Sequence, residues 1–428
     1  MFTLAVHTRP FRGLVSSAGL CPIVCLAAAC AGGGASPGAP ATPVAAHSAI
    51  PAPRRPALSA GADTNDPSAY NGFASTRLRS HPEVAAAAFY WMQRLSPSAP
   101  LAYYGERVAR LLSDRRLLRD YIDEDRRTLQ SAAVLRLDSL QIRALTLDPF
   151  FPQFLDEQLI ITYWINEVGR QARTQATGTS FASDDEIEAY VRHELQVSSD
   201  SATEAWLAYA RGNYRLAASY WAVRLMRDST DTHLMARRAK ALFLAGQPDS
   251  ARAQLQRALA AARRSDAKTM KYVYDSKVLW EYEVGWIDEL QKHDSAARES
   301  YQRALVEDLS FYPAHLRLAY VALRSRDTTT AVTELQRAIE VKENDFETRL
   351  LLGVLLAARH QLPPASEQLR RAAEIEPWVA YTHFVLGNVR TEVSDTQGAA
   401  AEYRRFLELA PRSDPNIPVA RQRLTAAP

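Results

Sequence analysis

Cysteine is nearly absent from this chain, and its few positions exclude several classes of site. The 428 residues contain three cysteines, Cys21, Cys25 and Cys30, and none follows them. A disulfide framework or a cysteine-ligated zinc site needs several cysteines along the folded body. The sequence therefore excludes both from everything after residue 30.

Glycine and proline are also few, at 17 and 23 residues. An all-β protein of this length needs turn signals about every 8–12 residues, so this class is excluded. After residue 80, apolar residues recur at three- and four-residue spacing without alternating runs, which predicts helices. The hydrophobic fraction of 47% is too high for a wholly disordered chain.

Lysine is scarce, with 6 residues against 45 arginines. Arginine is the residue that forks onto phosphates, but here it alternates with acidic residues along helical segments and forms no basic block. The formal net charge is +3. We therefore expect no nucleic-acid partner.

The first residues have the composition of an export signal. Arg9 and Arg12 precede an apolar stretch of small residues, too short and interrupted for a membrane span, that ends at Cys30. The segment Leu26-Ala27-Ala28-Ala29-Cys30 resembles the lipobox of bacterial lipoproteins, although the leucine stands one position early. The resemblance implies a signal peptide over 1–29, lipidation of Cys30, and a protein held at the outer membrane facing the periplasm. An ordinary cleaved signal is the alternative.

Residues 30–80 are rich in alanine, proline, glycine and serine and carry few large apolar groups. Such a segment buries too little surface to offset its ordering entropy. We expect a disordered tether between the lipidated cysteine and the folded body.

The second half of the chain repeats with a period of 34 residues. Six units start at residues 198, 232, 278, 312, 346 and 380, so that the repeated region spans 198–413. Small residues share two columns of the alignment. The eighth column is Ala205, Ala239, Gly285, Ala319, Gly353 and Gly387, and the twentieth is Ala217, Ala251, Ala297, Ala331, Ala365 and Ala399. Small residues at such spacing let two antiparallel helices approach closely, and stacked units bury the remaining apolar faces.

This pattern resembles the tetratricopeptide repeat (TPR) family. The resemblance implies an all-α, right-handed superhelical solenoid of helix-turn-helix units. Arg224 and Phe406 depart from the small residue expected in the twenty-seventh column, and the insertion 266–277 separates the second unit from the third. The insertion lacks glycine and proline, so we expect longer helices there. Residues 414–428 are expected to form a capping helix, polar on its outer face.

Residues 81–197 fit the same template only at their start, with Ala85 in the twentieth column and Gly105 in the eighth column of the next unit. Beyond Asp120 the register is lost. We expect divergent helical, TPR-like repeats packed against the regular ones, including an amphipathic helix over 149–173 and another opened by a capping box at Ser183.

No catalytic or metal-binding motif rises above background. There is no G-x-S-x-G, no phosphate loop and no H-E-x-x-H, and the nine histidines are scattered. The scattered histidines, including His315 and His383 in one column, predict helix-surface positions. We therefore expect no catalytic site, metal or cofactor. An enzyme with a concealed site in 121–197 is the less favoured alternative.

The TPR resemblance places a partner-binding groove on the concave face, along the first helix of each unit. We call the residues at these places the groove positions: Trp206, Tyr209, Lys240, Phe243, Tyr282, Trp286, Leu316, Tyr320, Tyr381, Phe384 and Asn388. Aromatic groups with polar tips suit the binding of a peptide segment. Two alternatives stay open: several of these rings fill the core between repeats, or they stack on the sugar rings of cell-wall glycan.

The favoured hypothesis is a non-enzymatic, lipid-anchored scaffold or assembly factor of the cell envelope. Its partner would be a protein or peptide, with no small-molecule substrate evident.

Overall fold

The computed structural model describes residues 52–122, 132–153, 156–174, 183–197, 201–268 and 277–426. The predicted signal peptide, Cys30 and the first part of the tether lie outside these residues. Helices make up the described ranges, and none of those ranges contains a strand. The all-α solenoid expected from the sequence is confirmed.

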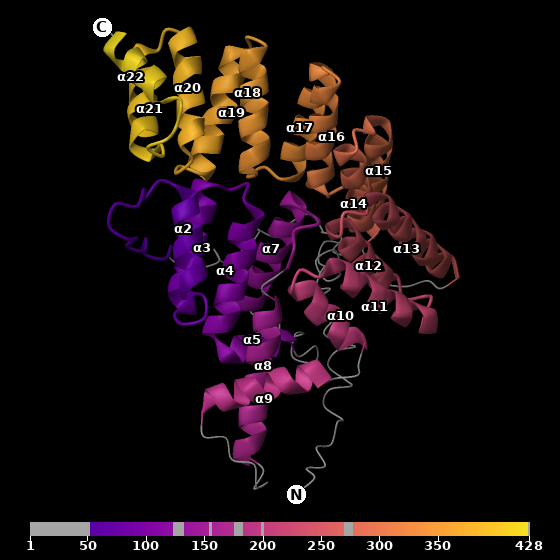
Figure 1. Cartoon of the computed structure of the whole chain (residues 1–428). Helices are drawn as coiled ribbons and strands as arrows, with labels where there is room; N and C mark the ends of the chain where they lie inside the picture. The colour runs from indigo at the N-terminus through magenta and orange to yellow at the C-terminus, as the bar shows by residue number, and fades with distance from the viewer. Residues whose placement is uncertain are drawn as a thin grey trace, which may run out of the picture.

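Within the described residues, twenty helices follow one another (Figure 1). The first seven are α2 (Pro67–Arg77), α3 (Pro82–Leu95), α4 (Pro100–Ser113), α5 (Arg115–Ile122), α7 (Ala132–Leu147), α8 (Asp156–Thr174) and α9 (Asp184–Val197). Six follow as α10 (Ser201–Ala210), α11 (Tyr214–Arg227), α12 (Thr232–Leu244), α13 (Pro248–Lys268), α14 (Lys277–Leu290) and α15 (Asp294–Glu307). The last seven are α16 (Tyr312–Arg324), α17 (Thr328–Val341), α18 (Phe346–Ala358), α19 (Leu362–Ile375), α20 (Ala380–Glu392), α21 (Thr396–Leu409) and α22 (Ile417–Ala426).

Helices α10–α21 form six antiparallel hairpins, which we call the regular array. The alanines of its two small columns are nearly all fully buried. At Gly285 the approach is closer still, because a Cβ atom there would lie 2.6 Å from Cε1 of Tyr301 on the paired helix. The small columns therefore set the spacing of the two helices within each hairpin.

The turn inside each hairpin repeats as well. The fifteenth position of every unit has a left-handed backbone, with φ between 55° and 78°. These residues are Gly212, Gly246, Lys292, Arg326, His360 and Ser394. The first helix of the unit ends just before each of these residues, and the backbone N–H of the residue that follows donates to a carbonyl in the last turn of that helix. In the fourth unit, Asp327 N–H donates to the Ala322 carbonyl at 2.9 Å. Only two of the six are glycine, so glycine alone does not reveal this column.

The insertion after the second unit lengthens a helix. Helix α13 runs for 21 residues to Lys268, against 14 in α15, α17 and α19. The chain closes with α22, whose Ala420 is fully buried while Arg421, Gln422 and Arg423 are exposed.

Helix α3 packs against both α2 and α4. A Cβ atom on Gly105 of α4 would lie 2.5 Å from Cε1 of Phe89 on α3. In the regular array the glycine and the ring that it meets belong to one unit of the sequence alignment. Here the ring of Phe89 lies on the helix that precedes the glycine.

The expected tether ends earlier than residue 80. Helix α2 buries Tyr70 and Ala74 completely. The segment before it is also held: the Trp91 indole N–H donates to the Pro53 carbonyl at 2.9 Å, and Arg55 Nε donates to the Tyr70 hydroxyl at 2.6 Å. The alanine- and proline-rich composition suggested disorder, but three aromatic anchors, including Trp378 between α19 and α20, order residues 52–66.

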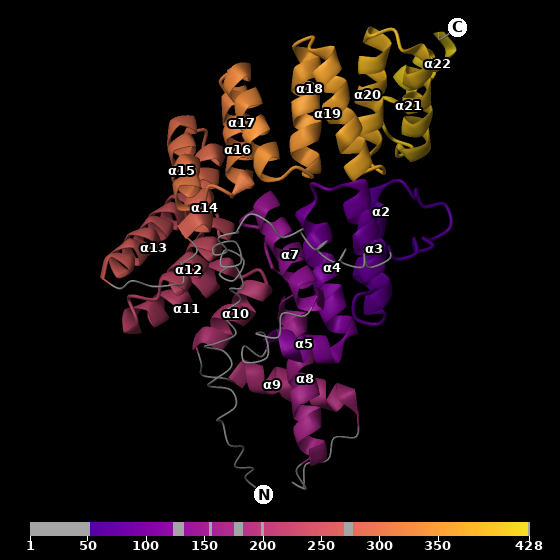
Figure 2. The same cartoon turned by 180° about the vertical axis from the view of Figure 1, so that it is seen from behind.

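The solenoid folds back on itself. Figures 1 and 2 both show the row α16–α21 lying against the ends of α2, α3, α4 and α7. The rings of Trp91 and Trp378 meet edge to face with centroids 5.1 Å apart, and Arg94 pairs with Glu376 at 2.9 Å. The side-chain amide of Asn65 donates to the Glu408 carbonyl at 2.8 Å. We call α2–α7 the N-terminal layer.

In the part of the chain that the structure describes, no helix combines the length and apolar character that crossing a bilayer requires.

Candidate partner-binding face

The groove positions lie on the first helices of the array, and the structure divides them by burial. Trp206, Tyr209, Tyr282, Leu316 and Phe384 are at most 9% exposed and belong to the hydrophobic core. Their rings and chains therefore pack the repeats together, as one of the sequence alternatives proposed. Lys240, Phe243, Trp286, Tyr320 and Asn388 are half-buried, and Tyr381 is 47% exposed.

A segment of the chain itself covers part of this face. Residues 143–151, which we call the inserted segment, run from the end of α7 into the loop before α8. The Phe150 ring stacks on Phe243 of α12 with centroids 3.9 Å apart. The Tyr282 hydroxyl of α14 donates to the Thr146 main-chain carbonyl at 2.9 Å. Phe150 is 1% exposed, so the contact is fully desolvated.

Neighbouring residues of the inserted segment contact different parts of the molecule. Phe151, next to Phe150, packs edge to face on Tyr104 of α4 at 5.6 Å, and so joins the N-terminal layer. Burial raises the pKa of Asp148, while the charge of Lys240 on α12 opposes that rise. The inserted segment thus links the N-terminal layer to the second and third repeats.

Arg143 extends the contact to the fourth and fifth repeats. Its guanidinium donates to the Tyr312 hydroxyl at 2.9 Å, and lies 3.4 Å from Asp345 and 3.6 Å from Glu347. Burial alone would lower the pKa of Arg143, but these partners together raise it, so the group stays charged. Nothing in the sequence singled out Arg143, because its partners lie about 170–200 residues away.

A second cluster lies beside the inserted segment. The Arg317 guanidinium sits over Trp286 at 4.4 Å and over Tyr320 at 5.0 Å, and its Nε donates to Glu289 at 2.9 Å. The Tyr320 hydroxyl in turn donates to Glu347 at 3.2 Å. Burial raises the pKa of Glu347, against the effect of Arg143. Charged and aromatic groups therefore run without a break from Arg143 across three repeats.

The last repeat contributes the most open position. Tyr381 stands at the start of α20, and Asn388 further along that helix accepts a hydrogen bond from the Tyr403 hydroxyl at 2.9 Å. The structure thus brings Tyr282, Trp286 and Tyr320 together, and leaves Tyr381 apart from them in another repeat.

Two histidines have structural roles. His315 Nδ1 lies 2.7 Å from Glu334, and His383 Nδ1 lies 2.7 Å from Glu402, each pair within one hairpin. His383 is 7% exposed, so the expectation of a surface histidine is corrected for it. In the described residues, no group of three or more histidine, cysteine, aspartate or glutamate side chains could hold a metal ion.

No model of a known protein family matches this sequence, and no curated protein matches it. Several solved structures of TPR proteins are similar in part. YrrB, described as a TPR protein with an unusual peptide-binding site, is 20% identical; the match covers 48% of this chain and all of YrrB, with a TM-score of 0.38. The C-terminal part of a TPR repeat-containing protein from Cytophaga hutchinsonii is 16% identical and covers 48% of this chain and 78% of its own length, with a TM-score of 0.41. MamA from Desulfovibrio magneticus RS-1 is 19% identical and covers 42% and 94%, with a TM-score of 0.34. At this identity and TM-score, the similarity carries no conclusion about function.

Proposed function

We propose that this chain is a non-enzymatic interaction scaffold that binds protein or peptide partners through the first-helix face of its regular array. The observation that supports it most is the inserted segment, since the chain's own residues 143–151 already lie on this face. The proposal includes export from the cytoplasm and lipid anchoring at Cys30, on the outer membrane facing the periplasm.

The contacts of the inserted segment are those that a peptide partner would use. A main-chain carbonyl accepts a hydrogen bond from Tyr282, which any peptide could offer. An aromatic side chain stacks on Phe243, and a guanidinium reaches the carboxylates of Asp345 and Glu347. Main-chain hydrogen bonds with pockets for a few side chains are a recurring mode of peptide recognition.

The half-buried cluster of Trp286, Arg317 and Tyr320 is the place for a partner, because it continues the same face beyond the inserted segment. Rigid aromatic rings beside a charged group give large contact area at low entropy cost. Binding to stacked sugars is less favoured, because in the described part of the chain Tyr381 is the single aromatic residue more than about a third exposed.

Crosslinking in cells, followed by affinity capture and mass spectrometry, tests the proposal. Trp286→Ala combined with Tyr320→Ala is expected to lose the partners that the unchanged chain captures. Tyr381→Ala, at an exposed position, is a second variant that leaves the core intact. The matched control is Val306→Ala on α15, which is 83% exposed and lies on a second helix. An unchanged set of partners in both groove variants would overturn the assignment of this face.

The anchor has its own test. Labelling with a palmitate analogue is expected to mark the unchanged chain and to disappear in Cys30→Ser. Label that persists in the variant would remove Cys30 as the attachment point, without bearing on the partner-binding face.

A further inference from the structure

The second helix of the first repeat, α11, has apolar residues at two positions where most of the other repeats are charged. In the alignment of the six units, Val223 stands in the twenty-sixth column and Met226 in the twenty-ninth. The other five units all have arginine in the twenty-sixth column: Arg257, Arg303, Arg337, Arg371 and Arg405. The last three units have glutamate in the twenty-ninth column: Glu340, Glu374 and Glu408.

In the last two repeats these two columns form ion pairs on the exposed side of the second helix. Arg371 Nη1 lies 3.3 Å from Glu374, and Arg405 Nη1 lies 3.0 Å from Glu408, each pair three residues apart. Such pairs keep the outer side of a helix hydrated. Helix α11 has no such pair at these columns, because both residues there are apolar.

Helix α11 instead exposes a stripe of apolar side chains. Leu216, Val223 and Met226 are 39%, 42% and 77% exposed. Residues that are seven and ten positions apart lie on one face of a helix, so this stripe extends over about 15 Å. Ser219 lies between them, and its hydroxyl donates to the main-chain carbonyl of Leu216 at 2.7 Å. The stripe thus offers little polar character to water, on a helix that packs against α10 and α12 (Figure 1).

Positive charge borders the stripe, and α11 itself contains no aspartate or glutamate. Arg215 and Arg227 are exposed, and at about 100° per residue they lie on opposite sides of the stripe. Asp228 directly follows the helix, and its carboxylate accepts the backbone N–H and the hydroxyl of Thr230 at 3.0 and 2.7 Å. An apolar stripe with basic borders is typical of a helix that lies on a membrane surface.

We propose that the outer face of α11 binds an anionic membrane surface. Leu216, Val223 and Met226 enter the boundary between headgroups and acyl chains, and the bordering arginines contact lipid phosphates with charge-assisted hydrogen bonds. A second copy of the chain fits this face less well. A symmetric contact would bring the arginines of two α11 helices together, and neither helix has an acidic residue to balance them.

This inference goes beyond the partner-binding face, which is formed by first helices, and it does not require the anchor at Cys30. Flotation with vesicles of phosphatidylglycerol and phosphatidylcholine, against vesicles of phosphatidylcholine alone, tests it. The protein is the full chain with Cys30→Ser, so that no lipid anchor contributes and residues 1–29 are the same in every comparison. We expect binding to the anionic vesicles that weakens as the salt concentration rises.

Absence of binding to the anionic vesicles, or equal binding to both kinds of vesicle, would overturn the proposal. Sedimentation equilibrium of the same protein without lipid addresses the other occupant. A dimer that dissociates in the α11 variant described next would assign this face to a second copy and would also overturn the proposal.

Val223→Arg combined with Met226→Glu gives α11 the residue types that the fourth repeat has at these columns, so the variant is compatible with the hairpin fold. It is expected to weaken vesicle binding by about tenfold or more, because two apolar side chains no longer leave water. The matched control is Val306→Glu, in the twenty-ninth column of the third repeat, where the valine is 83% exposed. An equal loss in the control, or no loss in the α11 variant, would contradict the assignment.

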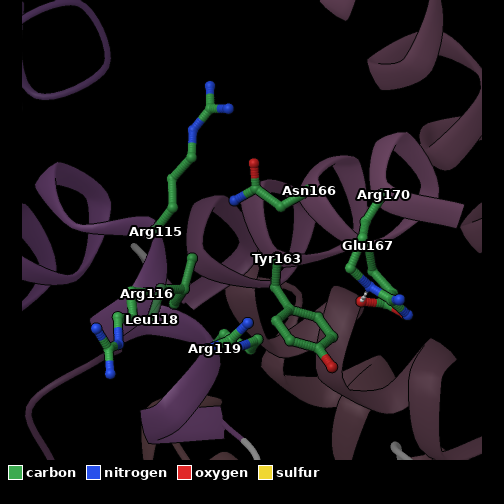
Figure 3. Close-up of a pocket in the computed structure, with 8 residues that line it drawn as sticks. All are labelled: Arg115, Arg116, Leu118, Arg119, Tyr163, Asn166, Glu167 and Arg170. Atoms are coloured by element: carbon green, nitrogen blue, oxygen red, sulfur yellow. Dashed lines mark hydrogen bonds and ion pairs between the residues drawn. The ribbon is translucent and has the colours of Figure 1, made fainter. Parts of the chain in front are cut away.

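A second group of arginines provides the control for charge. Arg115, Arg116 and Arg119 of α5 line a cavity of about 290 Å³ between α5 and α8 (Figure 3). Arg215→Gln with Arg227→Gln is expected to weaken binding to the anionic vesicles by about tenfold or more, and lysine at both positions should retain it. Arg115→Gln with Arg116→Gln should leave binding unchanged. A loss confined to the α5 pair would overturn the assignment to α11.

Discussion

The regular array and the N-terminal layer are built from the same helical hairpin but differ in what surrounds each unit. In the array, successive hairpins pack on one another through the same faces, so the same small columns recur. In the N-terminal layer, Asn65 just before α2, Arg94 of α3 and Thr146 of α7 also contact distant repeats. A unit with neighbours on a third side needs different residues on that side.

A buried charged side chain of the N-terminal layer illustrates the difference between the two regions. Glu106 in α4 is fully buried and takes hydrogen bonds from Arg110 Nε at 2.6 Å and Arg136 Nη2 at 2.9 Å. A buried carboxylate is stable only when paired in this way, and such pairs are set residue by residue. The layer therefore has helical hairpins without the 34-residue register, and its buried polar pairs are particular to it.

The largest expected effect is from Arg143→Ala. It leaves the carboxylates of Asp345 and Glu347 buried without their shared cation, and we expect a loss of about 3–5 kcal/mol of unfolding free energy. If the layer stabilises the array, urea unfolding and hydrogen exchange in α18 will both register the loss. The control is Arg371→Ala on the exposed face of α19, expected to change stability by less than about 0.5 kcal/mol. A small effect of Arg143→Ala would mean that the two regions are stable separately.

Adding one methyl group to the close contacts compares the two regions directly. Gly285→Ala in the array and Gly105→Ala in the layer each place a Cβ against a ring, at 2.6 and 2.5 Å, and are expected to destabilise by about 1–3 kcal/mol. Thermal unfolding measures both. Phe89→Leu should relieve Gly105→Ala, which would establish the close contact between α3 and α4.

The control for both is Gly72→Ala in α2, where nothing lies within 4 Å of the added Cβ. There we expect a gain of about 0.5–1 kcal/mol from helix propensity. A neutral Gly105→Ala would contradict the close packing of α4 on α3.

The contact between the layer and the array is expected to depend on pH through Glu376. Burial raises the pKa of Glu376 to about 7, although Arg94 and Arg143 act to lower it. A raised pKa in the folded chain means that protonation favours folding. The contribution is therefore fully present below the ordinary pKa of about 4.5 and declines as pH rises to about 7, by roughly 1–3 kcal/mol.

Unfolding free energies measured between pH 4.5 and 8 test this, with Glu376→Gln as the comparison. The variant is expected to flatten this part of the profile. Glu374→Gln, on the exposed face of α19, serves as its control and should keep the slope. An unchanged slope in Glu376→Gln would assign the pH dependence elsewhere.

The smallest expected effect lies in the turns of the array. Arg326→Gly removes the steric penalty of a left-handed side chain, and we expect a gain of about 0.5–1 kcal/mol after the added entropy of glycine in the unfolded chain. Gly246→Ala at the equivalent turn should lose about 1 kcal/mol. Thermal midpoints that moved the same way in both variants would contradict a shared turn geometry.

Periodic features of the molecule were predictable, and single contacts between distant segments were not. The small columns follow from the 34-residue alignment because six units repeat one packing problem. Arg143 and Phe150 each occur once, so no column marks them, and their partners are known only from the folded chain. The disorder expected for residues 52–66 was wrong for a related reason. Their composition is that of a linker, and the aromatic groups that hold them lie elsewhere in the sequence. Among the groove positions, the sequence placed each residue on a first helix, but which of them fill the core between repeats is known only from the folded chain.

The segment before α2 contacts the sixth repeat, so the last repeat of this solenoid has a neighbour outside the array. A linear repeat array opens from its termini, where the last unit has one neighbour. Here Asp63 accepts the backbone N–H of Arg412 at 2.6 Å, and Asn65 reaches the end of α21. The sixth repeat is thus fastened to residues 63–65, just before α2. Its unfolding would first have to break these contacts, so the last repeat of the array is supported on two sides.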